Sequence, residues 1–376
     1  MSGRTVLVLP SWYPTARHPF LGSFVRDHVR AASMYGHRMV VVVDEGVQHD
    51  LARPFSLTEE RDGEIRVFHF AYRLRAGLFG YVPAALSVAR RLAREGTPVD
   101  VLHAHIHRMG WAAVVLGAVL RKPTVITENS SGWPRRLLTP GEVWRARIAF
   151  RRAALVCPVN RRLKEAIERY GVHGDFRIVP NTVDTRVFHP GEPHRPADAK
   201  RLVNVSLHVG VKGLDVLLRA FSLLTPHDPG LTLELIGEGP LTPDLRRLAA
   251  ELGLDGRVFF SGLASPSEIS EALRASDVYV LSSLSENMPL AVLEALCCGL
   301  PVVGTDVGGV PEAVGRDGEL APAREAHALA LAIEKVLDEY SRFDRLEIAH
   351  RAAERWSFEA VGRVWDEIYE DLGPAI

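Results

Sequence analysis

Two glutamates with seven residues between them frame a helical pattern in the second half of the chain. The stretch SENMPLAVLEALCCGLPVVGT covers residues 285–305, with Glu286 before a proline and Glu294 inside the apolar run. Pro289 suits the first turn of a helix, because it lacks an N–H that would be unpaired there. Gly299 then ends the helix. We therefore expect Glu286 at the mouth of the helix and Glu294 about a turn and a half inside it.

A helix N-terminus beside two carboxylates suits a ligand that carries both phosphate and hydroxyl groups. The N–H groups of Asn287, Met288 and Leu290 can face phosphates, whereas Pro289 has none to offer. Glu294 is placed to accept hydrogen bonds from a ribose, as the acidic residue of dinucleotide-binding folds does. The alternative, a pair of surface glutamates, is weakened because apolar residues flank Glu294, and carboxylates are rarely buried without a partner.

Glycine-containing loops after other predicted strands offer further contacts, because ligands of open α/β sheets bind at the carboxyl ends of the strands. After the first strand, Gly22 allows a ligand to approach the backbone closely, and Ser23 opens a helix. Lys212 opens a later helix, where its charge could neutralise a diphosphate, or it could simply be a solvated lysine. The sequence IGEGP supplies Gly237 and Glu238 at another strand end.

The motif HAHIH at residues 103–107 places three histidines on one face of an extended chain. These histidines could bind a metal, line a cleft or belong to the core, and we favour the last two interpretations. No Asp-x-Asp occurs, so nothing indicates a magnesium bridge to a nucleotide sugar, and we expect no metal site. The absence of Gly-x-Gly-x-x-Gly argues against a nicotinamide-dinucleotide enzyme.

Apolar strands alternate with helical patterns along most of the chain, which predicts an α/β fold with mostly parallel sheets. In the first half, helices are expected at 23–35, 82–95 and 159–170, between strands that read RTVLVLP, HRMVVVV, VDVLHAH, PTVITE, AALVCPV and DFRIVP. The alternation restarts with RLVNVSL, LTLELIG, RVFFSG, VYVLSS and PVVGT. We expect two doubly wound domains, at residues 1–190 and 198–354, with a linker near 190–200 and a final amphipathic helix at 355–376 that packs on the first domain.

The composition is that of a soluble globular protein, with 376 residues, 47% hydrophobic and 24% charged. The longest apolar run, residues 110–120, is short of the ~20 residues that a membrane span needs. No targeting segment is visible, and Cys157 and the adjacent Cys297 and Cys298 do not suggest disulfides, so we expect a reducing, cytoplasmic location.

Charge is divided unevenly, with a net charge of +12 over residues 1–190 and −13 over residues 191–376. This asymmetry fits either attraction between two domains or an anionic partner of the first half. No nucleic-acid-binding motif is present, so we expect no nucleic acid among the partners.

The segment ENMPLAVLE, Glu286 to Glu294, resembles the E-x7-E motif of the retaining glycosyltransferases of family GT4, which have the GT-B fold. The resemblance covers nearly the whole chain, including PSWYPTARHPFLGSFVRDHV, VDVLHAH, YGVHGDFRIVPNTVDTRVFHP, VKGLDVLL, IGEGP, CCGLPVVGTDVGGVPE and ERWSFEAV. It implies two Rossmann-like domains facing a cleft and a nucleotide-diphosphate sugar as donor, of the UDP, GDP or ADP type.

The resemblance also implies roles for the residues singled out above. Lys212 and the amides around Asn287–Leu290 would hold the diphosphate without a metal, and Glu294 would bind the ribose. Glu286 would lie near the sugar ring, while Gly22 and Ser23 would approach from the first domain. Transfer with retention is implied, and we favour a front-face displacement, in which the leaving phosphate helps to deprotonate the acceptor, over a covalent intermediate.

Two departures from the family pattern affect the candidate catalytic residues. Leu207 or His208 stands where the family often has an arginine shortly before the lysine. Asn129 stands where the family often has a histidine, and an amide cannot take a proton at neutral pH. His105 or His107 is expected to line the same cleft, so the catalytic candidates are Glu286, Asn129 and His105.

The acceptor is expected on the first domain and would be a glycan, a glycolipid or a lipid-linked polysaccharide precursor. The segment WPRRLLTPGEVWRARIAFRRA, residues 133–153, is rich in arginine. It is either a solvated helix or a basic surface that meets an anionic membrane at its inner face. Two other functions stay open: a nucleotide-sugar epimerase or hydrolase of GT-B fold, and a non-catalytic nucleotide-sugar-binding protein.

Overall fold

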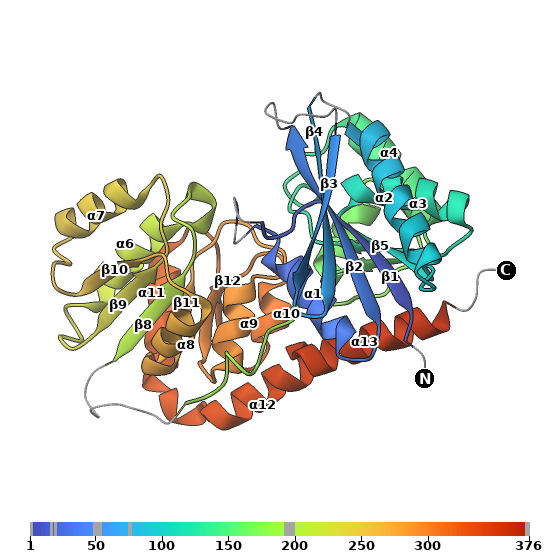
Figure 1. Ribbon diagram of the computed structural model, residues 1–376. Helices are drawn as coiled ribbons and strands as arrows, with labels where there is room; N and C mark the ends of the chain where they lie inside the picture. The colour runs from blue at the N-terminus through green and yellow to red at the C-terminus, as the bar shows by residue number, and fades with distance from the viewer. Residues whose placement is uncertain are drawn as a thin grey trace. The chain divides into compact units, whose positions relative to one another are not determined.

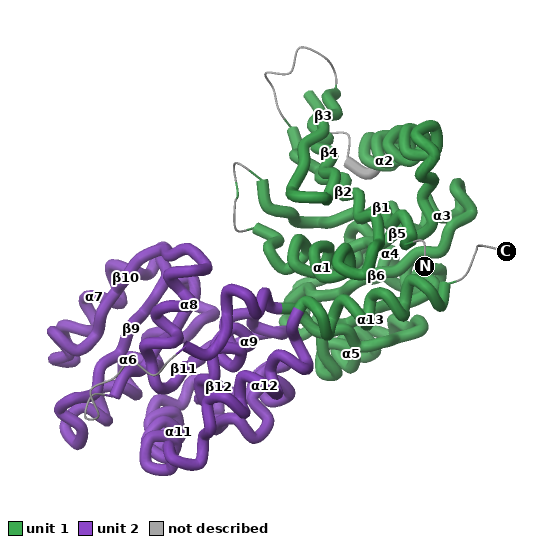
Figure 2. Tube along the Cα trace, turned by 60° about the horizontal axis from the view of Figure 1, so that its bottom comes forward, with its two compact units in different colours: residues 1–182, 358–376 green, residues 183–357 purple. Residues whose placement is uncertain are grey.

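The chain forms two compact units, which Figure 2 distinguishes by colour. Unit 1 comprises residues 1–182 and 358–376, and unit 2 comprises residues 183–357. The computed structural model describes residues 3–15, 18, 21–47, 55–73, 77–191 and 200–372. Figure 1 gives the labels of the helices and strands.

Unit 1 is built on a seven-stranded sheet with the order β3-β4-β2-β1-β5-β6-β7. The strands are β1 (Thr5–Pro10), β2 (Arg38–Val47), β3 (Phe55–Asp62), β4 (Ile65–Tyr72), β5 (Val101–His105), β6 (Thr124–Glu128) and β7 (Leu155–Pro158). All neighbours are parallel except β3 and β4. The continuous apolar runs predict this arrangement, because central parallel strands are covered on both faces.

Two features of this sheet differ from the sequence prediction. The antiparallel hairpin of β3 and β4 was not expected, since β3 is an edge strand that is largely exposed and has no apolar run. Residues 175–180, expected as a strand, form only a single bridge between Val156 and Phe176. The apolar residues of that segment are instead parts of an irregular connection.

Most helices of unit 1 pack against one another in two sets. Helix α1 packs against α13, whereas α3 packs against both α2 and α4. Their bounds are α1 (Ser23–Ser33), α2 (Gly77–Arg94), α3 (His107–Leu120), α4 (Pro140–Arg152), α5 (Arg161–Glu168) and α13 (Phe358–Asp371). The helices predicted at 23–35, 82–95 and 159–170 correspond to α1, the larger part of α2, and α5.

Histidines and aromatic residues join α13 to the rest of unit 1. The indole N–H of Trp365 donates to Nδ1 of His28 at 3.0 Å. His103 forms hydrogen bonds with Tyr369 at 2.7 Å and with Thr127 at 2.8 Å. All five side chains are buried, so the last helix completes the core of unit 1.

Unit 2 contains a six-stranded sheet in the order β10-β9-β8-β11-β12-β13, with every pair parallel. Its strands are β8 (Arg201–Val205), β9 (Thr232–Ile236), β10 (Val258–Gly262), β11 (Val278–Leu281), β12 (Val302–Thr305) and β13 (Gly318–Ala321). Its helices are η1 (Gly210–Lys212), α6 (Leu214–Leu224), α7 (Thr242–Glu251), α8 (Pro266–Ala275), α9 (Leu290–Cys297), α10 (Val310–Val314), α11 (Ala326–Asp338), η2 (Tyr340–Arg342) and α12 (Arg345–Trp356). The strand order reverses between β8 and β11, the kind of position where such sheets bind ligands.

The boundary between the units lies earlier than residue 190. Val183 N–H donates to the carbonyl of Trp356 at 2.8 Å, and the Ser270 hydroxyl donates to the carbonyl of Val187 at 2.7 Å. These bonds attach residues 183–190 to unit 2, which ends at Ser357. Most of the linker predicted near 190–200 lies outside the described residues.

Among the described residues, no helix is both long enough and apolar enough to cross a bilayer. Cys157, Cys297 and Cys298 are buried free thiols. Burial raises the pKa of all three, to about 12 for Cys298.

The buried histidines predict acid sensitivity of unit 1. Burial lowers the pKa of His28 to about 4 and that of His103 to about 3, whereas the unfolded chain titrates near 6.5. The folded state therefore binds fewer protons, so this stabilisation is complete above about pH 6.5 and is lost as the pH falls towards 4. We expect the free energy of unfolding to fall by up to about 1.4 kcal/mol per pH unit for each histidine.

Urea unfolding followed by tryptophan fluorescence checks this, because five of the six tryptophans belong to unit 1. The His103→Gln variant should show a shallower pH dependence, by about one proton. The exposed His173→Gln is the matched control and should leave the slope unchanged. Equal slopes for His103→Gln and the parent would contradict this account.

Candidate functional site

In unit 2, the loops that follow β8 and β9 lie against each other at the carboxyl ends of the strands. The N–H of His208 donates to the carbonyl of Glu238 at 3.0 Å. Gly237 has φ 130°, and a Cβ there would lie 2.0 Å from the carbonyl oxygen of Ser206. Only glycine fits this contact, so the predicted residues Gly237 and Glu238 are fixed beside the loop after β8.

An ion pair joins two of the predicted site residues. Lys212 Nζ lies 2.6 Å from Oε1 of Glu286, and the Ser283 hydroxyl donates to the same oxygen at 2.7 Å. The Lys212 side chain is 23% exposed and that of Glu286 is 11% exposed. Lys212 is therefore not a solvated surface lysine, and the structure brings it together with a carboxylate 74 positions away.

The backbone around this pair is closely fitted. Leu284 N–H donates to the carbonyl of Val211 at 2.7 Å, and the Ser282 hydroxyl donates to the carbonyl of Lys212 at 2.9 Å. Gly213 has φ 59°, and a Cβ there would lie 2.4 Å from the carbonyl oxygen of Ser282. The loops after β8 and β11 are thus held in contact at the point where the charges meet.

The mouth of α9 lies in the same set of loops. The helix begins at Leu290, with Pro289 as the extended N-cap residue rather than within the first turn, and Gly299 follows its end with φ 81°. Asn287 and Met288 are buried. The first N–H groups of a helix have no acceptor within the helix, so this end can receive an anion.

A third loop braces the mouth of α9. Gly308 after β12 has φ 51°, and a Cβ there would lie 1.8 Å from the carbonyl oxygen of Glu286. Gly309 N–H donates to the carbonyl of Asn287 at 2.5 Å, and the Thr305 hydroxyl donates to the carbonyl of Ser283 at 2.6 Å. This explains why glycines follow PVVGT in the sequence.

Glu294 is half-buried in the second turn of α9. Burial, together with the charges of Glu286 and Glu294, raises the pKa of Tyr279 on β11. Glu286, in the loop after β11, and Glu294, on α9, thus both act electrostatically on the same buried phenol.

Leu207 and His208, which stand where the family often has an arginine, lie in two different environments. Leu207 is 59% exposed, whereas His208 is buried with Nδ1 2.8 Å from the Thr242 hydroxyl. Sequence reasoning missed Leu263, which is also 59% exposed and follows Gly262, the bridge partner of Gly237. Leucines placed shortly after β8 and β10, the strands on either side of β9, are the sequence signal that could have found it.

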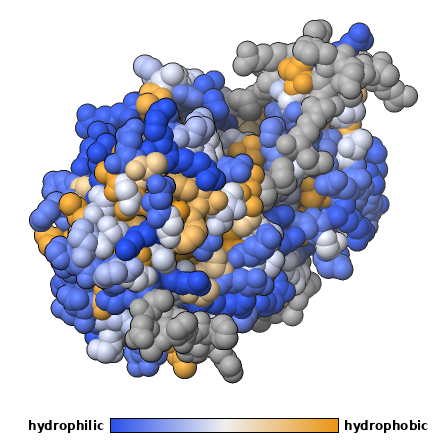
Figure 3. All heavy atoms as spheres, turned by 90° about the vertical axis from the view of Figure 1, so that its left-hand side faces the viewer, coloured by the Kyte–Doolittle hydropathy of each residue, from blue (hydrophilic) through white to orange (hydrophobic). Residues whose placement is uncertain are grey.

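Figure 3 views the molecule from the side of α7 and β10, where hydrophobic residues gather in the middle of the face and hydrophilic residues surround them. An exposed apolar surface of this kind can accept a flat ring. Phe259 is half exposed and lies on β10, which is an edge strand of the unit 2 sheet.

In unit 1, Gly22 has a packing role. It caps α1 with φ 77°, and a Cβ there would lie 2.4 Å from the backbone carbon of Trp12. Ser23, the first residue of α1, is half-buried beside it. Glycine is therefore required by the loop after β1, and this contact also fixes where Trp12 lies.

The histidines of HAHIH have different environments. His105 is 1% exposed, and its ring stacks on His103 with centroids 4.5 Å apart. Burial holds the pKa of His105 well below its usual range. His107, at the start of α3, lines a pocket, and its Nδ1 lies 2.9 Å from Oε2 of Glu128.

Glu128 is a buried carboxylate that sequence reasoning did not single out. It accepts hydrogen bonds from the N–H and the ring of His107 at 2.8 and 2.9 Å and from the N–H of Ser130 at 2.7 Å. Burial alone would raise the pKa of Glu128, but His107 and these donors outweigh it, so the pKa lies below the usual value. The next residue, Asn129, donates to the Asn181 side chain at 3.3 Å.

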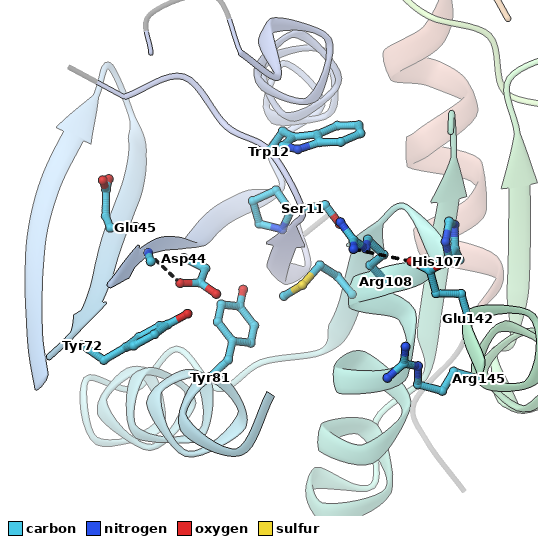
Figure 4. Close-up of a pocket in the computed structure, with 13 residues that line it drawn as sticks. Ser11, Trp12, Asp44, Glu45, Tyr72, Tyr81, His107, Arg108, Glu142 and Arg145 are labelled. Carbon is cyan, nitrogen blue, oxygen red and sulfur yellow. Dashed lines mark hydrogen bonds and ion pairs between the residues drawn. The ribbon is translucent and has the colours of Figure 1, made fainter. Parts of the chain in front are cut away.

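A pocket of about 580 Å³ opens above the carboxyl ends of β1, β2 and β5. In Figure 4, Asp44, Glu45 and Tyr72 lie on one side, and Arg108 and Arg145 lie on the other. The pocket is completed by Pro10, Ser11, Trp12, Gly46, Tyr81, His107, Met109 and Glu142. The pocket therefore offers carboxylates and guanidinium groups on opposite walls with aromatic rings between them.

The electrostatics of the two walls differ. Arg108 lies 3.4 Å from Glu142, whose carboxylate also accepts from Thr139 in the cap of α4. Asp44 is an exposed residue, but partial loss of solvent around its carboxyl raises its pKa, against a hydrogen bond from Gly46 N–H at 2.9 Å. Arg108 and Arg145 are both exposed, so an anion can reach them from solvent.

The histidines of HAHIH are engaged with one another and with Glu128, Thr127 and Tyr369. Within the described part of the chain, the group able to converge on an ion is His37, Asp366 and Glu370. His37 Nε2 already lies 3.1 Å from Asp366, and Glu370 lies 3.8 Å from Arg4. None of these residues belongs to the predicted site.

Solved structures share the architecture of the whole chain. Sucrose-phosphate synthase from Thermosynechococcus elongatus matches with a TM-score of 0.73 at 22% identity, covering 98% of this chain and 99% of that chain. Anabaena Alr3699/HepE in complex with UDP matches with a TM-score of 0.77 at 18% identity, covering 98% and 100%. The predicted fold class, two Rossmann-like domains of GT-B type, is confirmed.

Sequence comparison identifies the family. The D-inositol 3-phosphate glycosyltransferase of Corynebacterium jeikeium is 28% identical over 311 residues, which is 75% of this chain and 74% of that protein. The family model described as Glycosyltransferase Family 4 matches residues 21–187, and the model described as Glycosyl transferases group 1 matches residues 188–355. The two models cover both units one after the other, and the chain belongs to the family 4, group 1 glycosyltransferases.

Proposed function

We propose that this glycosyltransferase transfers a sugar, with retention, from a nucleotide-diphosphate sugar to a glycan, glycolipid or polysaccharide precursor without a metal. The observation that carries the proposal is the Lys212–Glu286 ion pair at the mouth of α9. A cation, a carboxylate and a helix N-terminus in one place suit a ligand with an anionic leaving group and a polar ring.

The donor occupies unit 2 in this proposal. The diphosphate replaces Glu286 as the ion-pair partner of Lys212 and contacts the N-terminus of α9. Glu294 accepts hydrogen bonds from the ribose. Glu286, released from the lysine, faces the sugar. The exposed Leu207 and Leu263 flank Glu238 and suit the flat face of a nucleobase. The UDP named with the Anabaena structure supports a donor of the UDP type, with GDP and ADP sugars as alternatives.

The acceptor occupies the pocket of unit 1. Asp44 and Glu45 can accept hydrogen bonds from hydroxyl groups, and Trp12 offers a flat apolar surface to a sugar ring. Arg108 and Arg145 suit an anionic group on the acceptor. The relative named D-inositol 3-phosphate glycosyltransferase supports an acceptor of this polar, anionic kind.

Proton transfer is assigned to the leaving phosphate in a front-face displacement rather than to a side chain. Asn129 serves as a hydrogen-bonding group, because an amide does not take a proton at neutral pH. His105 has no step in this proposal, since its ring is buried in the histidine cluster. Lys212 and the helix N-terminus stabilise the charge that develops on the diphosphate.

Donor binding tests the first part of the proposal. One class of nucleotide sugar should raise the melting temperature, and Lys212→Ala should weaken its affinity roughly 10- to 100-fold through loss of a charged contact. Glu294→Ala should weaken it by a similar factor. Thermal shift against UDP, GDP, ADP and CMP sugars measures this, with Lys200→Ala as the control, since Lys200 is a paired lysine that directly precedes β8. No shift from any of these sugars would refute the assignment.

Glu286→Gln should separate binding from turnover. The variant keeps the shape of the side chain but loses the charge beside the sugar, so we expect kcat to fall about 100-fold or more while the KM for the donor stays within about 3-fold. Ser283→Ala removes only the hydroxyl that supports Glu286 and should lower kcat less. Steady-state kinetics of nucleotide release checks both variants, and an unchanged kcat in Glu286→Gln contradicts the role.

The acceptor assignment predicts a different kinetic pattern. In the double variant Arg108→Gln with Arg145→Gln, the KM for an anionic acceptor should rise roughly 10- to 100-fold, because two charged contacts are lost. The KM for the donor should stay unchanged, since both arginines lie in unit 1. An equal loss for neutral and anionic acceptors would show that the arginines act on the fold rather than on the acceptor.

A further inference from the structure

A second concave surface lies on the outside of unit 1, between α3 and α4. It has a volume of about 890 Å³ and shares no residue with the acceptor pocket. Its apolar lining comes mostly from one side of α3 and is extended by α4, with the members Trp111, Val114, Val115, Ala118, Val119 and Ile148. We call this surface the α3–α4 groove.

The surroundings of the groove are unusually apolar for a surface. Val119 is 58% exposed, and Trp144 of α4 is 56% exposed. The rings of Trp144 and Trp111 lie 6.0 Å apart, so the aromatic surface continues from the groove onto α4. Apolar surface bordered by polar groups marks interaction sites rather than ordinary protein exterior.

Cations line one end of the same groove. Arg121 and Lys122 follow α3, and Arg152 ends α4. Lys122 lies 3.7 Å from Asp100, and no acidic residue is among the side chains that line the groove. Arg121 and Arg152 are exposed. The groove therefore combines an apolar wall with positive charge, on a half of the chain whose net charge is +12.

We propose that the α3–α4 groove binds anionic phospholipid at a membrane surface, with the cations on the phosphate groups and Trp111, Val119 and Trp144 at the boundary of the acyl chains. A soluble phosphate would use the cations but would leave the apolar wall unexplained. A neutral apolar partner would use the wall but not the charge. Tryptophan and basic side chains together are what the interface of a bilayer selects.

This surface goes beyond the transfer reaction and does not depend on it, because all of its residues lie in unit 1 and none lies in the donor site or the acceptor pocket. The sequence alone predicted only that residues 133–153 could form a basic surface. Of the arginines on α4, the inference assigns Arg152, with Arg121 and Lys122 from beyond α3, rather than the whole arginine-rich segment.

Flotation of the full chain with lipid vesicles tests the inference. At low salt, the protein should float with vesicles of phosphatidylcholine and phosphatidylglycerol and not with phosphatidylcholine alone. The double variant Arg121→Gln with Arg152→Gln should lower the partition coefficient roughly 30-fold. Val119→Glu, which adds a negative charge to the apolar wall, should lower it as well.

The matched control removes two exposed arginines from unit 2, in Arg219→Gln with Arg316→Gln, and should keep at least most of the binding. Melting temperatures and the thermal shift with nucleotide sugar should be unchanged in all variants, which separates this inference from the donor assignment. Absence of flotation at low salt, equal binding to neutral vesicles, or equal losses in the control variant would overturn the proposal. So would self-association of the parent that Val119→Glu abolishes without vesicles present.

Discussion

The contact between Lys212 and Glu286 organises the candidate donor site. It forms because β8 and β11 are neighbours in the sheet, so the loops that follow them leave the same edge. A partly exposed ion pair contributes little to stability, and its importance is positional. It keeps a cation and a carboxylate next to the start of α9, where backbone N–H groups already favour negative charge. Gly213 and Gly308 allow the backbones to come close enough for this to happen.

In unit 1, by contrast, polar side chains are buried together with their hydrogen-bonding partners. His103 lies between Thr127 and Tyr369, and Glu128 accepts three hydrogen bonds around the start of α3. Buried polar groups are costly unless they are satisfied, so these networks also specify how α13 and α3 pack. The final helix is part of unit 1 because Trp365 and Tyr369 complete this network, although 175 residues of unit 2 precede it in the chain.

Helix α3 connects the two concave surfaces of unit 1. Its first turn brings His107 and Arg108 to the pocket above β1, β2 and β5, and its outer side from Trp111 to Val119 forms the apolar wall of the α3–α4 groove. One side of α3 packs on the sheet, while its first turn and its outer side are both accessible. The helix can therefore contact two ligands at once.

The sequence by itself determined the alternation of strands and helices, the extent of α9 from its proline to Gly299, and the family motif between Glu286 and Glu294. These are local features, set by apolar periodicity, caps and turn residues. The hairpin of β3 and β4 had a signal too, in Asp62 and Gly63 at its turn, but its edge strand lacks an apolar run. Only the tertiary structure paired Lys212 with Glu286, buried His105 while placing His107 at a pocket, and assigned residues 183–190 to unit 2. The first depends on which strands are neighbours, and the other two depend on how helices pack on the sheets. In each case the fold brings together residues whose local sequences carry no record of one another.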